Sequence, residues 1–139
     1  MAVRGGLTTE EFFKAYPEEL RLELIDGGVY EMPAPSFIHQ LILTRLLRLF
    51  LEHPKTKDKL VPSPIDIVLS EDTVLQPDIV YVSDTSKVKD KVYCIPDLVV
   101  EVVSPSTLKR DLVDKMKIYE SQGVKEYWLV FPSEKTIMV

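Results

Sequence analysis

Three short segments of the chain are apolar on both faces of a β-strand, and this pattern limits the possible folds more than any other feature of the sequence. They are PIDIVL (64–69), QPDIVYV (76–82) and PDLVVEVVS (96–104). Strands that are apolar on both faces lie in a sheet that is covered on both sides. The sequence therefore predicts an α/β (α+β) layer fold in which helices flank a central mixed β-sheet.

Two segments predict the helices that cover this sheet. In residues 36–52, apolar side chains fill one half of the helix circumference and polar side chains fill the other half. His39 falls in the middle of the apolar half. Residues 107–121 predict a second helix, which ends at Gly123 because glycine readily adopts the backbone conformation that closes a helix.

The N-terminal part predicts a short helix and a β-hairpin. Residues 8–20 contain a capping pattern in which Glu11 follows Thr8 by three positions. Residues 21–32 have the composition of two strands around an Asp-Gly-Gly turn. After this hairpin the expected order is helix, strand, strand, strand, helix, strand (α-β-β-β-α-β). The last of these strands is KEYWLVF (125–131), and the chain stops within a further apolar segment, so we expect one domain over residues 1–139, shortened at its C-terminus.

Composition excludes several classes of protein. The 139 residues have a formal net charge of −5, which argues against a general nucleic-acid coat protein but not against an enzyme that holds a metal with acidic side chains. No apolar run approaches the roughly 20 residues of a membrane span, and the first residues lack the apolar stretch of a signal peptide. The single cysteine, Cys94, cannot form an internal disulfide, which fits a cytoplasmic protein.

A carboxylate interrupts one of the apolar strands. Glu101 lies within LVVEVV (98–103), where an unpaired buried charge is costly. An edge strand with Glu101 facing water is one alternative, but the valines on both faces disfavour it. Asp78 follows Pro77 and opens the strand IVYV, a position at which aspartate often bonds its own backbone. The pattern predicts that Glu101 is held inward for a purpose.

Lys115 is the third unusual charge. At about 100° per residue, it lies within the apolar stripe of helix 107–121, beside Leu108. The other basic residues of this helix are expected to point away: Lys109, Arg110 and Lys117. A lysine whose stem lies along apolar surface is one alternative. If the helix packs back on the strand before it, Lys115 instead comes close to Glu101.

Asp78, Glu101 and an inward Lys115 suit the chemistry of phosphodiester hydrolysis. Carboxylate oxygens are the ligands that Mg²⁺ prefers, and the bound ion leaves positions for water and for a phosphate oxygen. Such an ion lowers the pKa of its water and stabilises the charge that develops on phosphorus. A nearby lysine orients or deprotonates the water, or neutralises the phosphate.

Four segments of the chain, taken in order, resemble a known family. They are RLELIDGGVYEMPAPSFIHQ (21–40), QPDIVYV (76–82), PDLVVEVVSPST (96–107) and DKMKIYESQGVKEYWLVFP (114–132). Together they resemble the Uma-type putative restriction endonucleases, a family of the PD-(D/E)XK nuclease superfamily. This resemblance implies a restriction-endonuclease-like core and a nuclease activity that depends on Mg²⁺ or Mn²⁺.

The resemblance also implies roles for individual residues. Asp78 corresponds to the acid of the Pro-Asp element and Glu101 to the acid of the second element, both as metal ligands. The superfamily lysine normally stands two residues after the second acid, where this chain has Val103. Lys115, on the following helix, corresponds to it instead. Glu23 corresponds to a glutamate that frequently completes the acidic cluster.

Other polar residues remain open between a site and a structural role. Glu23 alternates with leucines and could lie on the solvent face of the hairpin. His39 could be a core histidine or a residue near the site. Gln76 precedes the Pro-Asp pair as in many family members, and Asp66 is a minor candidate. Asp97 also follows a proline, and we expect it to bond the backbone.

The leading hypothesis from the sequence is a Mg²⁺-dependent DNA endonuclease in which Asp78, Glu101, Lys115 and Glu23 are catalytic. A second hypothesis is a catalytically inactive nuclease-fold module that binds nucleic acid or a protein partner. A third treats Lys115 and Glu101 as a purely structural ion pair. A homodimer is an open possibility because cleavage of both strands of a duplex calls for two-fold symmetry.

Overall fold

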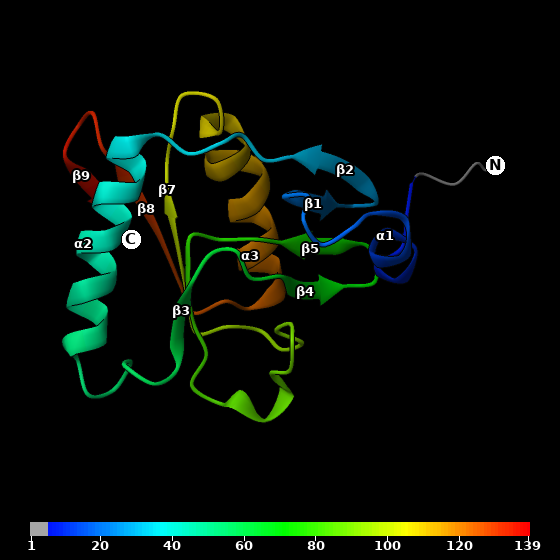
Figure 1. Cartoon of the computed structure of the whole chain (residues 1–139), viewed down its shortest axis with the longest axis horizontal. Coiled ribbons are helices and arrows are strands. Elements are labelled where there is room, and N and C mark those ends of the chain that lie inside the picture. The colour runs from blue at the N-terminus through cyan, green and yellow to red at the C-terminus, as the bar shows by residue number, and fades with distance from the viewer. Residues whose placement is uncertain (1–5) are drawn as a thin grey trace.

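Two β-sheets organise the part of the chain that the computed structural model describes, residues 6–139 (Figure 1). The larger sheet has the strand order β3-β6-β7-β8-β9. Strands β7 and β8 are parallel and the other neighbours are antiparallel, so the sheet is mixed as predicted. Its strands are β3 (Leu60–Pro62), β6 (Ile79–Tyr81), β7 (Leu98–Val102), β8 (Glu126–Phe131) and β9 (Thr136–Met138).

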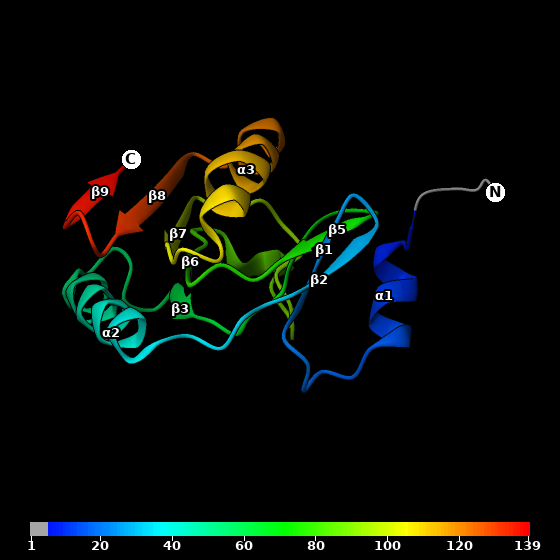
Figure 2. The same ribbon diagram turned by 90° about the horizontal axis from the view of Figure 1, so that it is seen from above.

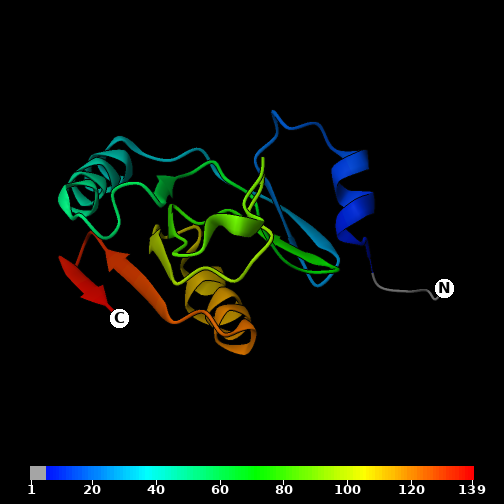
Figure 3. The same ribbon diagram turned by 90° about the horizontal axis from the view of Figure 1, so that it is seen from below.

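Helices cover both faces of the larger sheet. Helix α2 (Phe37–Glu52) lies on one face, and the π-helix η2 (Arg110–Lys115) continues into α3 (Met116–Gln122) on the other (Figures 2 and 3). Side chains of β7 alternate between the two faces. Val100 packs with Leu43 of α2, whereas Val99 packs with Tyr119 of α3. The alternation places Glu101 on the α3 face.

The smaller sheet has the order β2-β1-β5-β4 and is covered on its outer side by α1 (Thr9–Ala15). Its strands are β1 (Leu22–Ile25), β2 (Gly28–Glu31), β4 (Ile67–Ser70) and β5 (Thr73–Leu75). Phe12 of α1 packs on Leu24 of β1. The opposite face of this sheet contributes Ile25 and Leu75 to the same core as Val99, so the two sheets share one apolar interior.

The N-terminal elements confirm the predicted capping and hairpin. The Thr8 side chain accepts a hydrogen bond from the backbone N–H of Glu11, whose carboxylate accepts one from the backbone N–H of Thr8. Helix α1 ends at Ala15, earlier than the predicted residue 20, because Pro17 disfavours the helical conformation at the residue before it. The expected absence of a signal peptide concerns the first residues of the chain. Residues 1–5 among them lie outside the described part.

The central sheet and its helices follow the predicted α/β class, with additions. Strands β3 and β5 were not predicted, because each has only three residues and neither has a clear alternation. Strand β4 overlaps the predicted strand at 64–69 and belongs to the smaller sheet rather than to the larger one. A short 3₁₀ helix, η1 (Thr85–Lys87), lies in the connection between β6 and β7. No helix among the described residues is long and apolar enough to cross a membrane.

The predicted helix at 107–121 forms, but its first part is a π-helix. It ends at Gly123, whose φ of +87° is the left-handed conformation expected at this position. Leu108 is 40% exposed, so its predicted place in the buried stripe is wrong. The wider π turn changes which residues of the segment share a face, because its hydrogen bonds join residues five apart instead of four.

Candidate functional site

Asp78 and Glu101 lie opposite each other on neighbouring strands. Strands β6 and β7 are antiparallel, with Ile79 paired to Val100, so the same register places Asp78 opposite Glu101. Directly opposite residues point to the same face of a sheet. Both carboxylates are buried, with Asp78 at 7% and Glu101 at 3% exposure. Because β7 lies between β6 and β8, the alternative of a water-facing edge strand is wrong.

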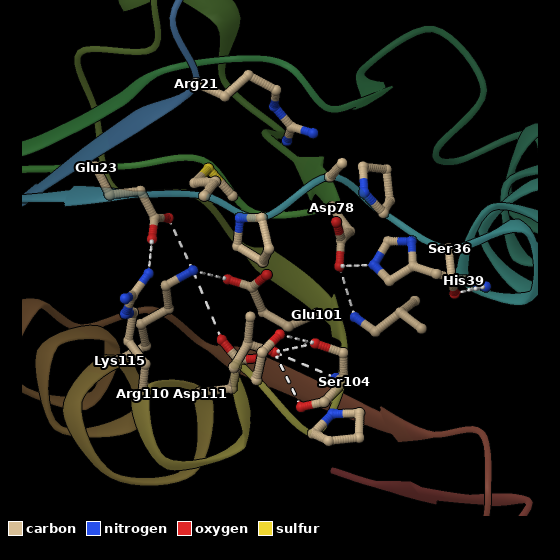
Figure 4. Close-up of a pocket in the computed structure, with 18 residues that line it drawn as sticks. Arg21, Glu23, Ser36, His39, Asp78, Glu101, Ser104, Arg110, Asp111 and Lys115 are labelled. Carbon is tan, nitrogen blue, oxygen red and sulfur yellow. Dashed lines mark hydrogen bonds and ion pairs between the residues drawn. The ribbon is translucent and has the colours of Figure 1, made fainter.

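Lys115 joins three carboxylates from different elements (Figure 4). Its Nζ lies 2.9 Å from Glu101 Oε2, 2.8 Å from Glu23 Oε2 and 3.7 Å from Asp111 Oδ1. Lys115 is only 2% exposed, so its ammonium does not extend along the surface to water. The predicted approach of Lys115 to Glu101 is confirmed, and the alternative of a lysine with a solvated head is wrong.

Glu23 is fully buried, so its placement on the solvent face of the hairpin is also wrong. Its Oε2 accepts a hydrogen bond of 2.8 Å from the backbone N–H of Gln76. Its Oε1 has no hydrogen-bond partner among the described residues and lies 3.8 Å from Arg110 Nη1. The carboxylate of Glu23 thus connects the smaller sheet to the helix that supplies Lys115.

Burial and the neighbouring charges shift the pKa values of Glu101, Asp111 and Lys115. Burial raises the pKa of Glu101 well above its usual range, and the charges of Asp111, Asp78 and Glu23 add to the rise while Lys115 opposes it. Burial also raises the pKa of Asp111, to about 6. Burial alone would lower the pKa of Lys115, but the surrounding carboxylates outweigh this effect and raise it. At neutral pH, Lys115 therefore stays charged.

His39 reaches the other end of this acidic group. Its Nε2 lies 3.3 Å from Asp78 Oδ2, an oxygen that also accepts a 2.6 Å hydrogen bond from the backbone N–H of Val102. The hydrogen bond to Asp78 raises the pKa of His39. His39 is therefore a residue of the site, and it holds Asp78 from helix α2 while Val102 holds it from strand β7.

The π-helix contributes two further residues that the sequence analysis did not identify. Residues five apart are brought together in a π turn, so Arg110 and Lys115 both face Glu23. The prediction that Arg110 points away from the site is therefore wrong. Asp111 is 3% exposed beside Lys115. Its position four residues before an inward lysine was the available signal, because such pairs adjoin on a helix.

These side chains surround a pocket of about 250 Å³. One wall is the connection before α2, and the other is the loop after β7, which carries a cluster of hydroxyl groups (Figure 4). Arg21, which precedes β1, also lines the pocket. The polar and charged lining residues are Arg21, Glu23, Ser36, His39, Asp78, Glu101, Ser104, Ser106, Thr107, Arg110, Asp111 and Lys115.

Three of the other candidates lie outside this pocket. The side chain of Gln76 donates a hydrogen bond to Asp66 Oδ1, so both residues connect strands rather than line the site. Asp97 accepts hydrogen bonds from the backbone N–H and the hydroxyl of Ser83, as expected for an aspartate that bonds the backbone. Gln76 still touches the site, through its backbone N–H to Glu23.

The carboxylates that line the pocket suit a hard divalent cation, although they do not form a complete set of protein ligands. Among residues 6–139, no three histidine, cysteine, aspartate or glutamate side chains are arranged to hold a metal ion. Asp78 and Glu101 nevertheless both line the pocket with carboxylate oxygens, which Mg²⁺ prefers. Mg²⁺ usually retains several waters and needs only one or two carboxylates. The buried Oε1 of Glu23 has no hydrogen-bond partner among the described residues, so this oxygen is available to a cation-bound water.

The fold and this pocket define a class, a restriction-endonuclease-like α/β domain with a buried acidic site. The chain belongs to the Uma2 family, which is described as "Putative restriction endonuclease" and whose model matches residues 9–139. Its fold is similar to that of a crystal structure from Anabaena variabilis, titled a "putative nuclease belonging to DUF820". The TM-score is 0.80 at 21% identity, over 94% of this chain and 77% of that one. No curated protein matches the chain in sequence.

Proposed function

We propose that the chain is a Mg²⁺- or Mn²⁺-dependent endonuclease that hydrolyses phosphodiester bonds in DNA. The observation that carries this proposal is the convergence of Asp78, Glu101 and Lys115 in one pocket, with Lys115 Nζ 2.9 Å from Glu101. Membership of a family described as a restriction endonuclease supports a nucleic-acid substrate. The superfamily lysine is absent two residues after Glu101, where this chain has Val103. Lys115 of the following helix would take its role.

Asp78 and Glu101 would hold the cation, and their placement on adjacent strands fixes their separation. His39 and the backbone N–H of Val102 orient Asp78 by contacts to the same oxygen. A divalent ion held there would supply a bound water of lowered pKa and positive charge next to the phosphorus. Glu23 completes the acidic side of the pocket and positions Lys115 through the 2.8 Å contact.

The raised pKa of Lys115 favours a role in orienting water or neutralising phosphate over a role in deprotonating the water. An ammonium that remains protonated cannot accept a proton from water at neutral pH. It can donate hydrogen bonds to the attacking water or to a phosphate oxygen, and it can neutralise charge that develops in the transition state. We therefore assign Lys115 to positioning and charge stabilisation rather than to general base catalysis.

Cleavage of supercoiled plasmid DNA tests the proposal. The wild-type chain should relax or linearise the plasmid with Mg²⁺ or Mn²⁺ and should be inactive in EDTA. Asp78→Asn should abolish cleavage. Asp97→Asn is the matched control, because Asp97 also follows a proline at a strand start but bonds Ser83 outside the pocket. Absence of cleavage by the wild type, or equal cleavage by Asp78→Asn, would contradict the assignment.

A catalytically inactive module is the second candidate, and one observation favours it. Lys115 already occupies Glu101 Oε2, and no ready-made group of three metal-binding side chains exists among residues 6–139. Calorimetric titration with Mg²⁺ separates the two candidates. DNA binding without any metal binding at the carboxylates would favour the module over the enzyme.

A further inference from the structure

Two arginines in the pocket lack acceptors for their hydrogen bonds. Nε of Arg21 is buried and has no hydrogen-bond partner in the described part of the chain. The guanidinium of Arg110 likewise donates no hydrogen bond to residues 6–139. Its contacts there are Glu23 Oε1 at 3.8 Å and the ring of Tyr30, whose centroid is 4.9 Å away. Neither arginine has a role in holding the cation or in positioning Lys115.

A buried donor without an acceptor calls for an explanation in a folded protein, because nearly all buried polar groups are paired. A ligand that brings acceptor oxygens into the pocket satisfies such a donor. The guanidinium group has a planar set of N–H donors that matches the oxygens of a phosphate, and it cannot lose its charge. Both arginines line the same pocket as Asp78 and Glu101.

The two side chains reach the pocket from different elements (Figure 4). Arg21 stands two residues before Glu23, so the two residues share a face of the same extended segment. Arg110 comes from the π turn of η2 and stacks over Tyr30 of β2, which holds the guanidinium beside the smaller sheet. Arg110 therefore lies beside Glu23, whereas the guanidinium of Arg21 is turned toward the end of the pocket that holds Asp78 and His39.

The charges in the pocket also favour such groups. The single ammonium of Lys115 is shared by Glu101, Glu23 and Asp111, so it leaves negative charge that repels a phosphodiester. Arg21 and Arg110 are the lining cations outside that buried cluster. They offset this repulsion on the approach to the buried carboxylates.

We propose that Arg21 and Arg110 form a phosphate clamp that binds the backbone of a DNA substrate next to the cleaved bond. The clamp rests on the proposed nuclease function and adds the side chains that grip the substrate. The ligand chemistry is the phosphate oxygen, which a polynucleotide backbone, a nucleoside monophosphate or free phosphate could each supply. The polynucleotide is the source that we assign, since the pocket lies in a chain of a nuclease family.

The salt dependence of DNA binding tests the clamp. We would measure the affinity of the full chain for a short fluorescent duplex by anisotropy, with Ca²⁺ in place of Mg²⁺, over a series of salt concentrations. The slope of log K against log salt reports the number of neutralised phosphates, and each lost phosphate contact reduces it by about one. Arg21→Met and Arg110→Met should each flatten the slope by about one, and the double variant by about two.

Lys109→Met is the matched control, because it removes the same charge from the exposed residue next to Arg110. It should leave the slope close to that of the wild type. Thermal unfolding establishes that each variant is folded, and Arg21→Lys and Arg110→Lys, which retain the charge, should recover part of the slope. The same affinity and slope in the arginine variants as in Lys109→Met would overturn the clamp, as would a wild type that does not bind the duplex.

Competition identifies the source of the phosphate. Inorganic phosphate and adenosine monophosphate should displace the duplex only weakly. Tight binding of either compound at the arginines, without duplex binding, would overturn the assignment to a polynucleotide. Plasmid cleavage is scored separately: an inactive wild type contradicts the proposed enzyme, while the slopes still decide whether the arginines bind phosphate.

Discussion

The ammonium of Lys115 and the carboxylate of Glu101 form a buried contact of 2.9 Å between a helix and a strand. The contact spans 14 positions of the sequence, and Lys115 follows the strand by way of the π-helix η2. A lysine at position 103 would directly follow β7, two residues after Glu101, where extended chain directs both side chains to the same face. Lys115 instead comes from the helix that covers the face of the sheet with Glu101. From this helix its ammonium also contacts Glu23.

Removal of Lys115 should be strongly destabilising. Lys115→Met leaves Glu101, Glu23 and Asp111 buried without their common cation, and loss of one partner of a buried pair costs about 3–5 kcal/mol. Urea unfolding at pH 7 measures this loss. Lys117→Met, at an exposed site two residues away, should stay within about 0.5 kcal/mol of the wild type. Equal stability of the two variants would contradict the network.

Replacement of the pair by apolar residues should not restore stability. A simple Lys–Glu pair can be exchanged for apolar side chains at little cost. Here Lys115→Met with Glu101→Leu still leaves Glu23 without its 2.8 Å contact to the ammonium. We expect the double variant to remain less stable than the wild type in the same urea experiment. Wild-type stability in this variant would support the purely structural ion pair instead.

Asp111 should make stability depend on pH in mildly acidic solution. Its pKa is raised from 3.8 to about 6, so between these values the folded chain binds more protons than the unfolded chain. The contribution of Asp111 to stability therefore falls as pH rises through this window. A change of about 1–3 kcal/mol is expected from a shift of this size. Asp111→Asn should remove it, which urea unfolding at pH 4, 5, 6 and 7 measures against the wild type.

His39 should support cation binding through Asp78. A partner that orients a ligating carboxylate is typically worth about 10–100-fold in metal affinity. His39→Ala should weaken the binding of Mn²⁺ by this factor in a calorimetric titration, without abolishing it. His53→Ala is the control, because His53 is the C-cap at the opposite end of α2. An unchanged affinity in His39→Ala would show that the 3.3 Å contact to Asp78 does not influence the site.

The sequence pattern predicted the range of helix α2 closely, but it did not predict which apolar residues at the edge of the apolar half are buried. Leu43 is 6% exposed in the core, whereas Leu49 is 65% exposed although it belongs to the same predicted apolar arc. The part of the apolar face that carries Leu49 therefore does not pack against the sheet. Leu43→Ala should therefore cost about 2–5 kcal/mol in urea unfolding. Leu49→Ala should cost less than about 0.5 kcal/mol, as is typical of surface positions.

Sequence patterns predicted the parts of the site that follow from burial. Asp78 and Glu101 stand in segments that are apolar on both faces, and Lys115 lies in a helix that must pack back on its strand. The approach of Lys115 to Glu101 follows from those facts, whereas Asp78 was assigned to the site by its chemistry and by the resemblance to the nuclease family. The contact to Glu23 did not follow, because nothing local shows that the hairpin turns this face toward α3 in a second sheet.

Arg110 was misplaced for a different reason. Its expected direction assumed 100° per residue, and a single π turn rotates it by enough to face Glu23. The strain or packing that selects a π turn depends on tertiary contacts, so the sequence pattern does not reveal it. Strands β3 and β5 were missed because three-residue strands have too few positions for a period to be recognised.

The most direct test of the central claim is a crystal of the wild-type chain soaked in Mn²⁺, measured for anomalous scattering. We predict one strong peak in the pocket, bound by Asp78 and Glu101 at the distances of an oxygen-coordinated divalent ion, about 2.1 Å. The ammonium of Lys115 should remain within reach of Glu101. A peak elsewhere, or no peak at saturating Mn²⁺, would contradict the claim that these two carboxylates form a metal centre.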